Sequence, residues 1–164
     1  MTRQIIGYFT MTSTIDAQPK TFAEALDLVQ ASPTLRSVKS YLDNSDLSAD
    51  LKALLYDVAK VTIKIGETVI ALGRRIIEIA SALVAKFPNL TLGTLVGLAI
   101  GAVITSVLGG LPVIGGLVPL LSKLAVLLGI GKGFLDDLRE NAAKVQMDRI
   151  TAQFNALGMG IVRV

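Results

Sequence analysis

Residues 87–131 decide the fold class of this chain: they read FPNLTLGTLVGLAIGAVITSVLGGLPVIGGLVPLLSKLAVLLGIG and hold one charged side chain, Lys123, in 45 positions. The other 119 of the 164 residues hold 28 charged side chains, about 24%, which is near the share of an ordinary globular domain. The positive mean hydropathy of +0.62 therefore comes largely from this one stretch. The length leaves room for one domain with at most an appended segment.

Turn signals divide the stretch into two helices. As one helix, the uncharged run from Phe87 to Ser122 would be about 54 Å long, well beyond the roughly 30 Å of a bilayer's hydrocarbon core. A hairpin turn is marked by Gly110, Pro112, Gly115 and Gly116. The first arm is predicted over Leu90 to Leu108, and the second from Val113 or Leu117 to Ile130. Residues 88–131 are thus predicted to form an apolar hairpin of the membrane type.

Small residues repeat every fourth position on the first arm. The series comprises Gly93, Gly97, Gly101, Thr105 and Gly109. In lipid, close backbone approach through small residues drives helix association, whereas each glycine weakens a helix in water. We therefore predict a helix-packing face in a membrane. The alternative is a glycine-rich helix enclosed in a large water-soluble bundle.

Amphipathic helices are predicted on both sides of the hairpin. A capping box at Thr21-Phe22-Ala23-Glu24 begins a helix to Ala31, and Ser32-Pro33 begins a second one to about Leu42. Ser48 caps one long amphipathic helix to Phe87, in which a bend near Gly66 or Gly73 is left open. The last helix is predicted from Phe134 to just before Gly158, with Gly158 as a left-handed cap.

These elements predict an all-α fold made of short N-terminal helices, one long amphipathic helix, a Gly-rich apolar helical hairpin and a C-terminal amphipathic helix. An extended arm with some strand character precedes them, and a short tail of similar character can pair with it. The predicted boundaries are 1–20 for the arm, 21–87 for the amphipathic helical region, 88–131 for the hairpin, 132–158 for the C-terminal helix and 159–164 for the tail.

Basic side chains flank the hairpin, and its turn carries no charge. By the positive-inside rule we expect a membrane protein with both hairpin ends on the cytoplasmic side. The N-terminal arm lacks the apolar run of a secretory signal, so Sec export is not expected. Contacts with anionic headgroups or a lumen are predicted for Lys60, Lys64, Arg74, Arg75 and Lys123. For Lys123 three interpretations stay open. First, it snorkels from a shallow arm. Second, it faces a lumen or a carboxylate in an oligomer. Third, it marks the end of the embedded region, or the fold is soluble.

The composition excludes several chemistries. Without Cys or His the chain has no thiolate nucleophile, imidazole base, disulfide or Cys/His zinc site. No convergent set of other polar residues indicates an enzyme, so we expect no catalytic residue, cofactor, metal or small-molecule substrate. Gly129 to Gly133 lacks the spacing of a phosphate-binding loop. A net charge of only +3 and scattered aromatic residues argue against nucleic acid as a partner.

Amphipathic helices around a Gly-rich hairpin with an uncharged turn form a layout similar to that of pore-forming colicin domains and other helical membrane-inserting effectors. Here a further helix follows the hairpin, and the resemblance is one of architecture alone. The first hypothesis is a self-associating membrane protein, a homo-oligomer that inserts the hairpin into a lipid bilayer with anionic headgroups and permeabilises or remodels it. The alternative is a structural shell, virion or scaffold subunit whose hairpin is buried between protomers.

Overall fold

The computed structural model describes residues 17–111, 116–129 and 144–161. Within these ranges helices dominate and the one sheet is a two-stranded hairpin, which confirms the all-α class. The elements in chain order are α3 (Phe22–Gln30), α4 (Leu35–Asp43), α5 (Ala49–Ala59), β1 (Ile63–Ile65), β2 (Thr68–Ile70), α6 (Leu72–Lys86), α7 (Leu92–Thr105), the 3-10 helix η1 (Val107–Gly110), α8 (Leu117–Leu128) and α10 (Lys144–Gly158).

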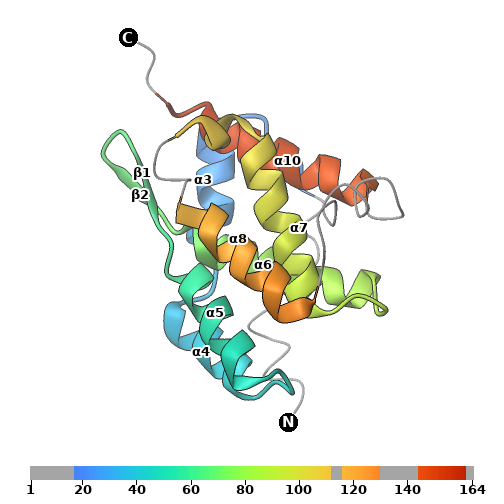
Figure 1. The fold of residues 1–164 in the computed structure, drawn as a ribbon. Helices are drawn as coiled ribbons and strands as arrows, with labels where there is room; N and C mark the ends of the chain where they lie inside the picture. Colours follow the sequence, from blue (N-terminus) through green and yellow to red (C-terminus); the bar gives the residue numbers. More distant parts are fainter. Residues whose placement is uncertain (1–16, 112–115, 130–143, 162–164) are drawn as a thin grey trace.

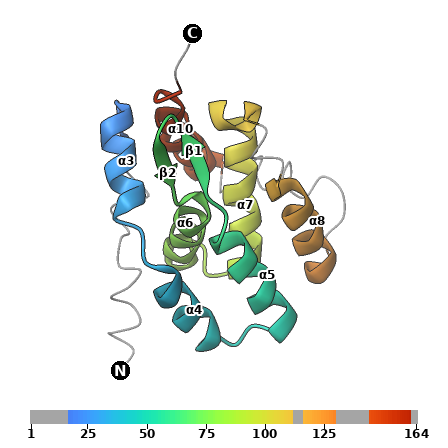
Figure 2. The ribbon, with the colours of Figure 1, turned by 90° about the vertical axis from the view of Figure 1, so that its left-hand side faces the viewer.

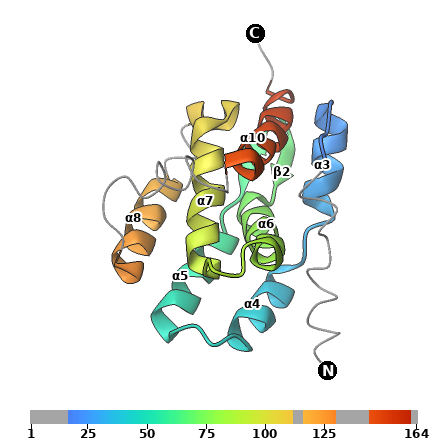
Figure 3. The same cartoon turned by 90° about the vertical axis from the view of Figure 1, so that its right-hand side faces the viewer.

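Helix α7 lies at the centre of the bundle (Figure 1). Helices α5, α6, α8 and α10 all pack against it, and its contact with α6 is the most extensive. In the two side views α3 and α8 lie at opposite edges, with α6, α7 and α10 between them (Figures 2 and 3). One apolar core runs through this arrangement and takes side chains from every described element. The centre of that core is the first arm of the hairpin.

Hydroxyl caps set where the N-terminal helices begin. The Thr21 hydroxyl accepts a bond from the Glu24 N–H at 3.2 Å, and the Glu24 carboxylate accepts one from the Lys20 N–H at 2.7 Å, so the predicted helix start is confirmed. Ser48 caps α5 as expected by accepting from the Leu51 N–H at 3.2 Å. The predicted cap at Ser32 is wrong, because Thr34 begins α4 and accepts from the Ser37 N–H at 3.1 Å.

The predicted single helix from Ser48 to Phe87 is also wrong. Helix α5 ends at Ala59, strands β1 and β2 form an antiparallel hairpin, and α6 then begins at Leu72. A two-residue loop, Gly66-Glu67, joins the strands, and Gly66 has φ +63°, which a glycine-first hairpin turn requires. The break occurs where β-branched residues gather, since these favour strands over helices. Val61, Ile65 and Leu72 fit helical spacing too, which is why the periodicity suggested one helix.

Gly73 lets α6 begin against the end of α5. Its N–H donates to the carbonyl of Val61 at 2.8 Å. A Cβ at this position would overlap the backbone carbonyl group of Val58 and come within 2.9 Å of the carbonyl carbon of Ala59. Because residue 73 has no Cβ, the backbones of α5 and α6 can approach each other closely. The sequence left open a bend at Gly66 or Gly73, and in the structure the helix is interrupted there by two strands.

Both arms of the hairpin are shorter than predicted. Helix α7 covers 14 residues of the expected first arm, because Thr91 caps its start and Ser106, with ψ 176°, ends it. Helix α8 follows the later of the two predicted starts and ends at Gly129, whose φ is +68°. Pro119 does not interrupt α8, since it lies in the first turn, where its missing N–H would have no helical partner. Of the predicted turn, Pro112 and Gly115 lie outside the described residues.

The last helix is described from Lys144 onward, so its predicted start at Phe134 lies outside the described residues. Gly158 is the final residue of α10, and the described glycines with positive φ are Gly66 and Gly129, so the predicted left-handed cap at Gly158 is wrong. Pairing of the arm with the tail concerns mainly residues 1–16 and 162–164, which also lie outside the described part of the chain.

Candidate functional site

Helix α7 is the apolar centre of the candidate site. It has no charged residue, and its first turn is fixed by the Thr91 hydroxyl, which accepts from the Thr94 N–H at 3.2 Å. Every residue from Leu92 to Val103 except Thr94 is buried. A helix that is apolar all round has to be covered on all sides. In this fold the chain's own helices provide that cover.

The glycines of the predicted packing face lie inside the bundle. Gly93, Gly97 and Gly101 are all buried. A Cβ built on Gly93 would lie 3.3 Å from the methyl groups of Leu128 on α8 and 3.5 Å from a methyl of Leu51 on α5, so α5 and α8 both meet α7 there. Close packing at this glycine therefore occurs within one chain.

The other two members of the series do not continue that face. Thr105 is exposed and its hydroxyl donates to the carbonyls of Gly101 and Ala102, both at 3.1 Å. Gly109 belongs to η1, after the helical phase has been broken at Ser106. The packing face thus covers three glycines of α7 rather than the four turns that the spacing predicted.

The described residues of the chain cover helix α8 on one side only. Leu117 and Leu124 are buried against the bundle, while Val118, Val126 and Leu127 are 49%, 79% and 45% exposed. Lys123, also exposed, is the one charged residue of this helix. The second arm of the hairpin therefore presents an apolar surface that the described residues of the chain leave open.

A groove of about 480 Å³ lies between the exposed sides of α8 and α5, which contact each other. Its walls are mainly apolar, and charged side chains stand on both of them: Asp50 and Asp57 on α5, and Lys123 on α8. Val126 and Leu127 line the same groove. Lys123 thus shares a groove with two carboxylates of its own chain, whereas the sequence alternatives included a carboxylate only in an oligomer.

The remaining basic residues of the predicted headgroup set are dispersed. Lys60 pairs with Asp57 at 3.2 Å and stands 5.1 Å from the centre of the Tyr56 ring, with both ends of the pair about half exposed. Lys64 is exposed on β1, and Arg74 is half-buried on α6. Of these three cations, Lys60 is paired with Asp57, which lines the same groove as Lys123, while Lys64 and Arg74 do not line it.

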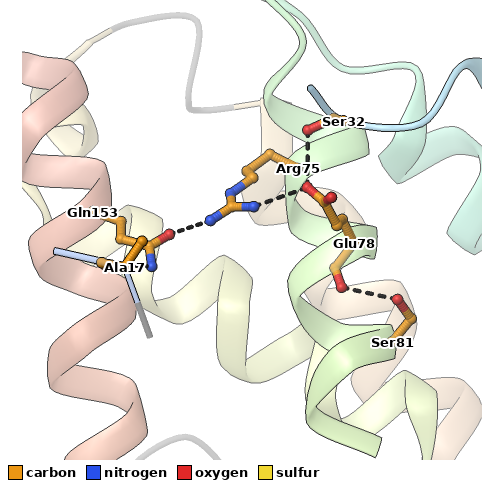
Figure 4. Close-up of polar contacts among 6 residues, drawn as sticks. All are labelled: Ala17, Ser32, Arg75, Glu78, Ser81 and Gln153. Atoms are coloured by element: carbon orange, nitrogen blue, oxygen red, sulfur yellow. Dashed lines mark hydrogen bonds and ion pairs between the residues drawn. The ribbon is translucent and has the colours of Figure 1, made fainter. Parts of the chain in front are cut away.

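Arg75 does not reach the surface, contrary to the prediction of a headgroup or lumen contact. Its side chain is 2% exposed and lies between α6 and α10 (Figure 4). One guanidinium nitrogen donates to Glu78 Oε1 at 2.8 Å, and another donates to the side-chain oxygen of Gln153 on α10. Arg75 is therefore a structural cation in the core.

Glu78 and Gln153 extend this pair to the start of the described chain. Ser32 donates to Glu78 Oε1 at 3.1 Å, and the Gln153 amide nitrogen donates to the Ala17 carbonyl at 2.9 Å (Figure 4). Burial lowers the pKa of Arg75, and the neighbouring Glu78 opposes that shift. Glu78 Oε2 has no hydrogen-bond partner among the described residues. The network ties α6 to α10 and to the segments on either side of α3.

Sequence reasoning missed both the groove and this network. The signal for the network was the opposite charges of Arg75 and Glu78, three residues apart, within an otherwise apolar run. Nothing in the sequence could place Asp50 and Asp57 opposite Lys123, because that depends on how the separate helices α5 and α8 pack.

Comparison of the chain with protein-family models, curated proteins and solved structures found no match. No helix among the described residues combines the length and apolar character needed to cross a bilayer. The same residues contain no group of three or more acidic side chains placed to hold a metal ion.

Proposed function

We propose that this protein is a self-associating, membrane-active helical bundle whose apolar hairpin, α7 with α8, leaves the bundle and inserts into a bilayer, which it permeabilises. In this proposal the described fold is the closed form. The observation that carries it is the pairing of a largely buried, uncharged helix with a second arm on which Val118, Val126 and Leu127 are exposed.

The way in which the hairpin is held supports this proposal. Helix α7 has no charged residue, so no ion pair anchors it, and the buried network of Arg75, Glu78 and Gln153 joins elements outside the hairpin. Leucine packed against acyl chains is about as stable as leucine packed against leucine. The apolar contacts that α7 loses on leaving the bundle are therefore replaced in lipid, while the polar network stays intact.

Insertion also has a length requirement. If the backbone becomes helical both at Leu90 and Thr91, where Thr91 is now extended, and from Ser106 onward, Leu90 to Leu108 form one helix about 28 Å long, close to the roughly 30 Å hydrocarbon core. In the closed form the extended backbone at Ser106 and the short helix η1 replace that last turn. Opening in this proposal therefore includes a local refolding of the segment after α7.

A disulfide lock tests the proposal directly. The end of the first arm meets α10 where the Val107 N–H donates to the Asn155 side-chain oxygen at 2.8 Å. A Cβ built on Gly158 would lie 2.9 Å from the Cβ of Val107, against about 3.8 Å in a disulfide, so a shift of about 1 Å is enough. Because the chain has no cysteine, Val107→Cys with Gly158→Cys gives a single possible bridge.

The readout is dye release from vesicles of anionic and of neutral lipid. We expect the oxidised double variant to release little dye, the same sample after reduction to release dye like the wild type, and both single variants to be active in either state. Equal release from the oxidised and reduced forms would refute the opening step. No release from the wild type on anionic vesicles would refute the proposed function itself.

The exposed apolar side of α8 favours one second function, a structural subunit of a larger assembly whose hairpin is buried between protomers. Since α7 is covered by its own chain, only α8 would contribute apolar surface to that burial. This alternative predicts a large, defined homo-oligomer that forms without detergent and releases no dye. Sedimentation with and without detergent, run beside the vesicle assay, separates the two functions.

A further inference from the structure

The groove between α5 and α8 has two unlike walls. Asp50 and Asp57 stand on the α5 side, and Lys123 stands on the α8 side. Val126 and Leu127 line it and still expose 79% and 45% of their surface. One patch of this molecule therefore offers an apolar ridge, an apolar groove, a cation and two carboxylates.

Such a patch is complementary to itself. In a two-fold dimer every contact occurs twice, because residue i of one copy meets residue j of the other and residue j meets residue i. A surface that holds both a ridge and a groove, and both signs of charge, can therefore pair with a second copy. An anionic bilayer fits this patch less well, since two carboxylates beside the apolar residues would be brought against headgroups of like charge.

We infer that a second copy of this chain, related by a two-fold axis, occupies the groove. Val126 and Leu127 of each copy lie in the groove of the other, and Lys123 of each copy faces the other copy's Asp50 and Asp57. This inference rests on the self-association in the proposed function and names its partner surface. It is independent of whether the hairpin enters a bilayer.

The two kinds of contact have different parts in this dimer. Apolar burial of Val126 and Leu127 supplies most of the affinity, and the exposed charges set the partner and the register. Asp57 already meets Lys60 at 3.2 Å, in a pair that is about half exposed, so it is shared between two cations in the dimer. The interface is small, so we expect a dimer that forms reversibly with concentration.

In the closed form this dimer covers the open side of α8. The carboxylates belong to α5, and they remain with the bundle when the hairpin leaves. Dimerisation and insertion therefore compete for the same helix, and separation of the two copies has to precede entry into lipid.

The test uses two charge-reversal variants that fail alone and pair with each other. In a dimer of Lys123→Glu, the new carboxylate at position 123 repels Asp50 and Asp57 of the partner. In a dimer of the double variant Asp50→Lys with Asp57→Lys, the unchanged Lys123 repels the two new lysines of the partner. Like charges in contact weaken pairing, so we expect each variant to dimerise at least about tenfold more weakly than the wild type in sedimentation equilibrium. In an equimolar mixture both contacts become attractive again, and we expect the wild-type affinity to return to within a few-fold.

Val126→Ser supplies a second variant that does not depend on charge. Its matched control is Val69→Ser on β2, since Val69 is 63% exposed and lies away from the groove. We expect the first to weaken the dimer and the second to leave it unchanged, with the circular dichroism of both like the wild type.

Three results would overturn the inference. They are a wild type that stays monomeric at every concentration, a mixture that fails to restore pairing although both variants are folded, and a Val126→Ser protein that dimerises like the wild type. Dye release by the Asp50→Lys and Asp57→Lys double variant keeps this test separate from the proposed function. We expect release at least as fast as from the wild type, because its hairpin is unchanged and no longer covered; slower release would contradict the competition.

Discussion

Replacing Glu78 with leucine should be among the most damaging single changes outside the backbone contacts. The Arg75 and Glu78 side chains are 2% and 1% exposed, and the ion pair measures 2.8 Å. Glu78→Leu leaves the guanidinium buried with Gln153 but without its carboxylate, and breaking a buried pair on one side costs about 3–5 kcal/mol. For a chain of this length that corresponds to a fall of about 10 °C in Tm.

A double-mutant cycle measures how strongly the charges of Arg75 and Glu78 are coupled. Arg75→Met should cost a similar amount, because it leaves the Glu78 carboxylate buried, whereas the double variant removes both charges and should cost only about 1–3 kcal/mol from the partners left on Ser32 and Gln153. Urea denaturation followed by far-ultraviolet circular dichroism measures all four proteins. Single variants that each cost less than about 1 kcal/mol, or costs that simply add, would refute the reasoning that burial couples these charges.

Other changes test the fold at separate points. Gly73→Ala places a Cβ on the carbonyl of Val58 and should lower the free energy of unfolding by about 1–3 kcal/mol or more through overpacking. Gly110→Ala is the control, since a Cβ there would meet nothing within 4 Å and should cost little. Equal urea midpoints for the two variants would contradict the close approach of α5 and α6. Ser48→Ala removes the cap of α5 and should cost about 1 kcal/mol in the same assay, with Ser40→Ala on the exposed side of α4 as the comparison. Burial raises the pKa of Tyr41, so the contribution of Tyr41 to the free energy of unfolding should be fully present below about pH 10 and be lost as the pH rises through the raised pKa. Tyr41→Phe should reduce that loss, and an identical pH dependence of stability in the two proteins would contradict the burial of this phenol.

Local sequence patterns predicted the helices whose ends carry their own signals. Thr21 and Ser48 cap α3 and α5 where expected, because a hydroxyl that satisfies a first-turn N–H acts within three residues. The turn-rich middle of the apolar stretch was also sufficient to separate α7 from α8. The all-α class follows from such local features.

The prediction failed where a longer pattern had two solutions. Between Val61 and Leu72 the apolar residues fit a helix and a strand pair alike, and the choice depends on Gly66 and on the contact of Gly73 with α5. That contact is tertiary. For the same reason the sequence could not show that Arg75 lies in the core or that α5 faces α8, since both depend on how separate helices pack.

Contact of the hairpin with lipid can be measured by tryptophan fluorescence. The chain has no tryptophan, so Val118→Trp on α8, outside the groove, and Val69→Trp on β2 each report from a single exposed position. With anionic vesicles the account predicts a blue shift for residue 118 and quenching by lipids brominated on their acyl chains, while residue 69 keeps its emission in water. A tryptophan at residue 118 whose emission neither shifts nor is quenched would contradict the account.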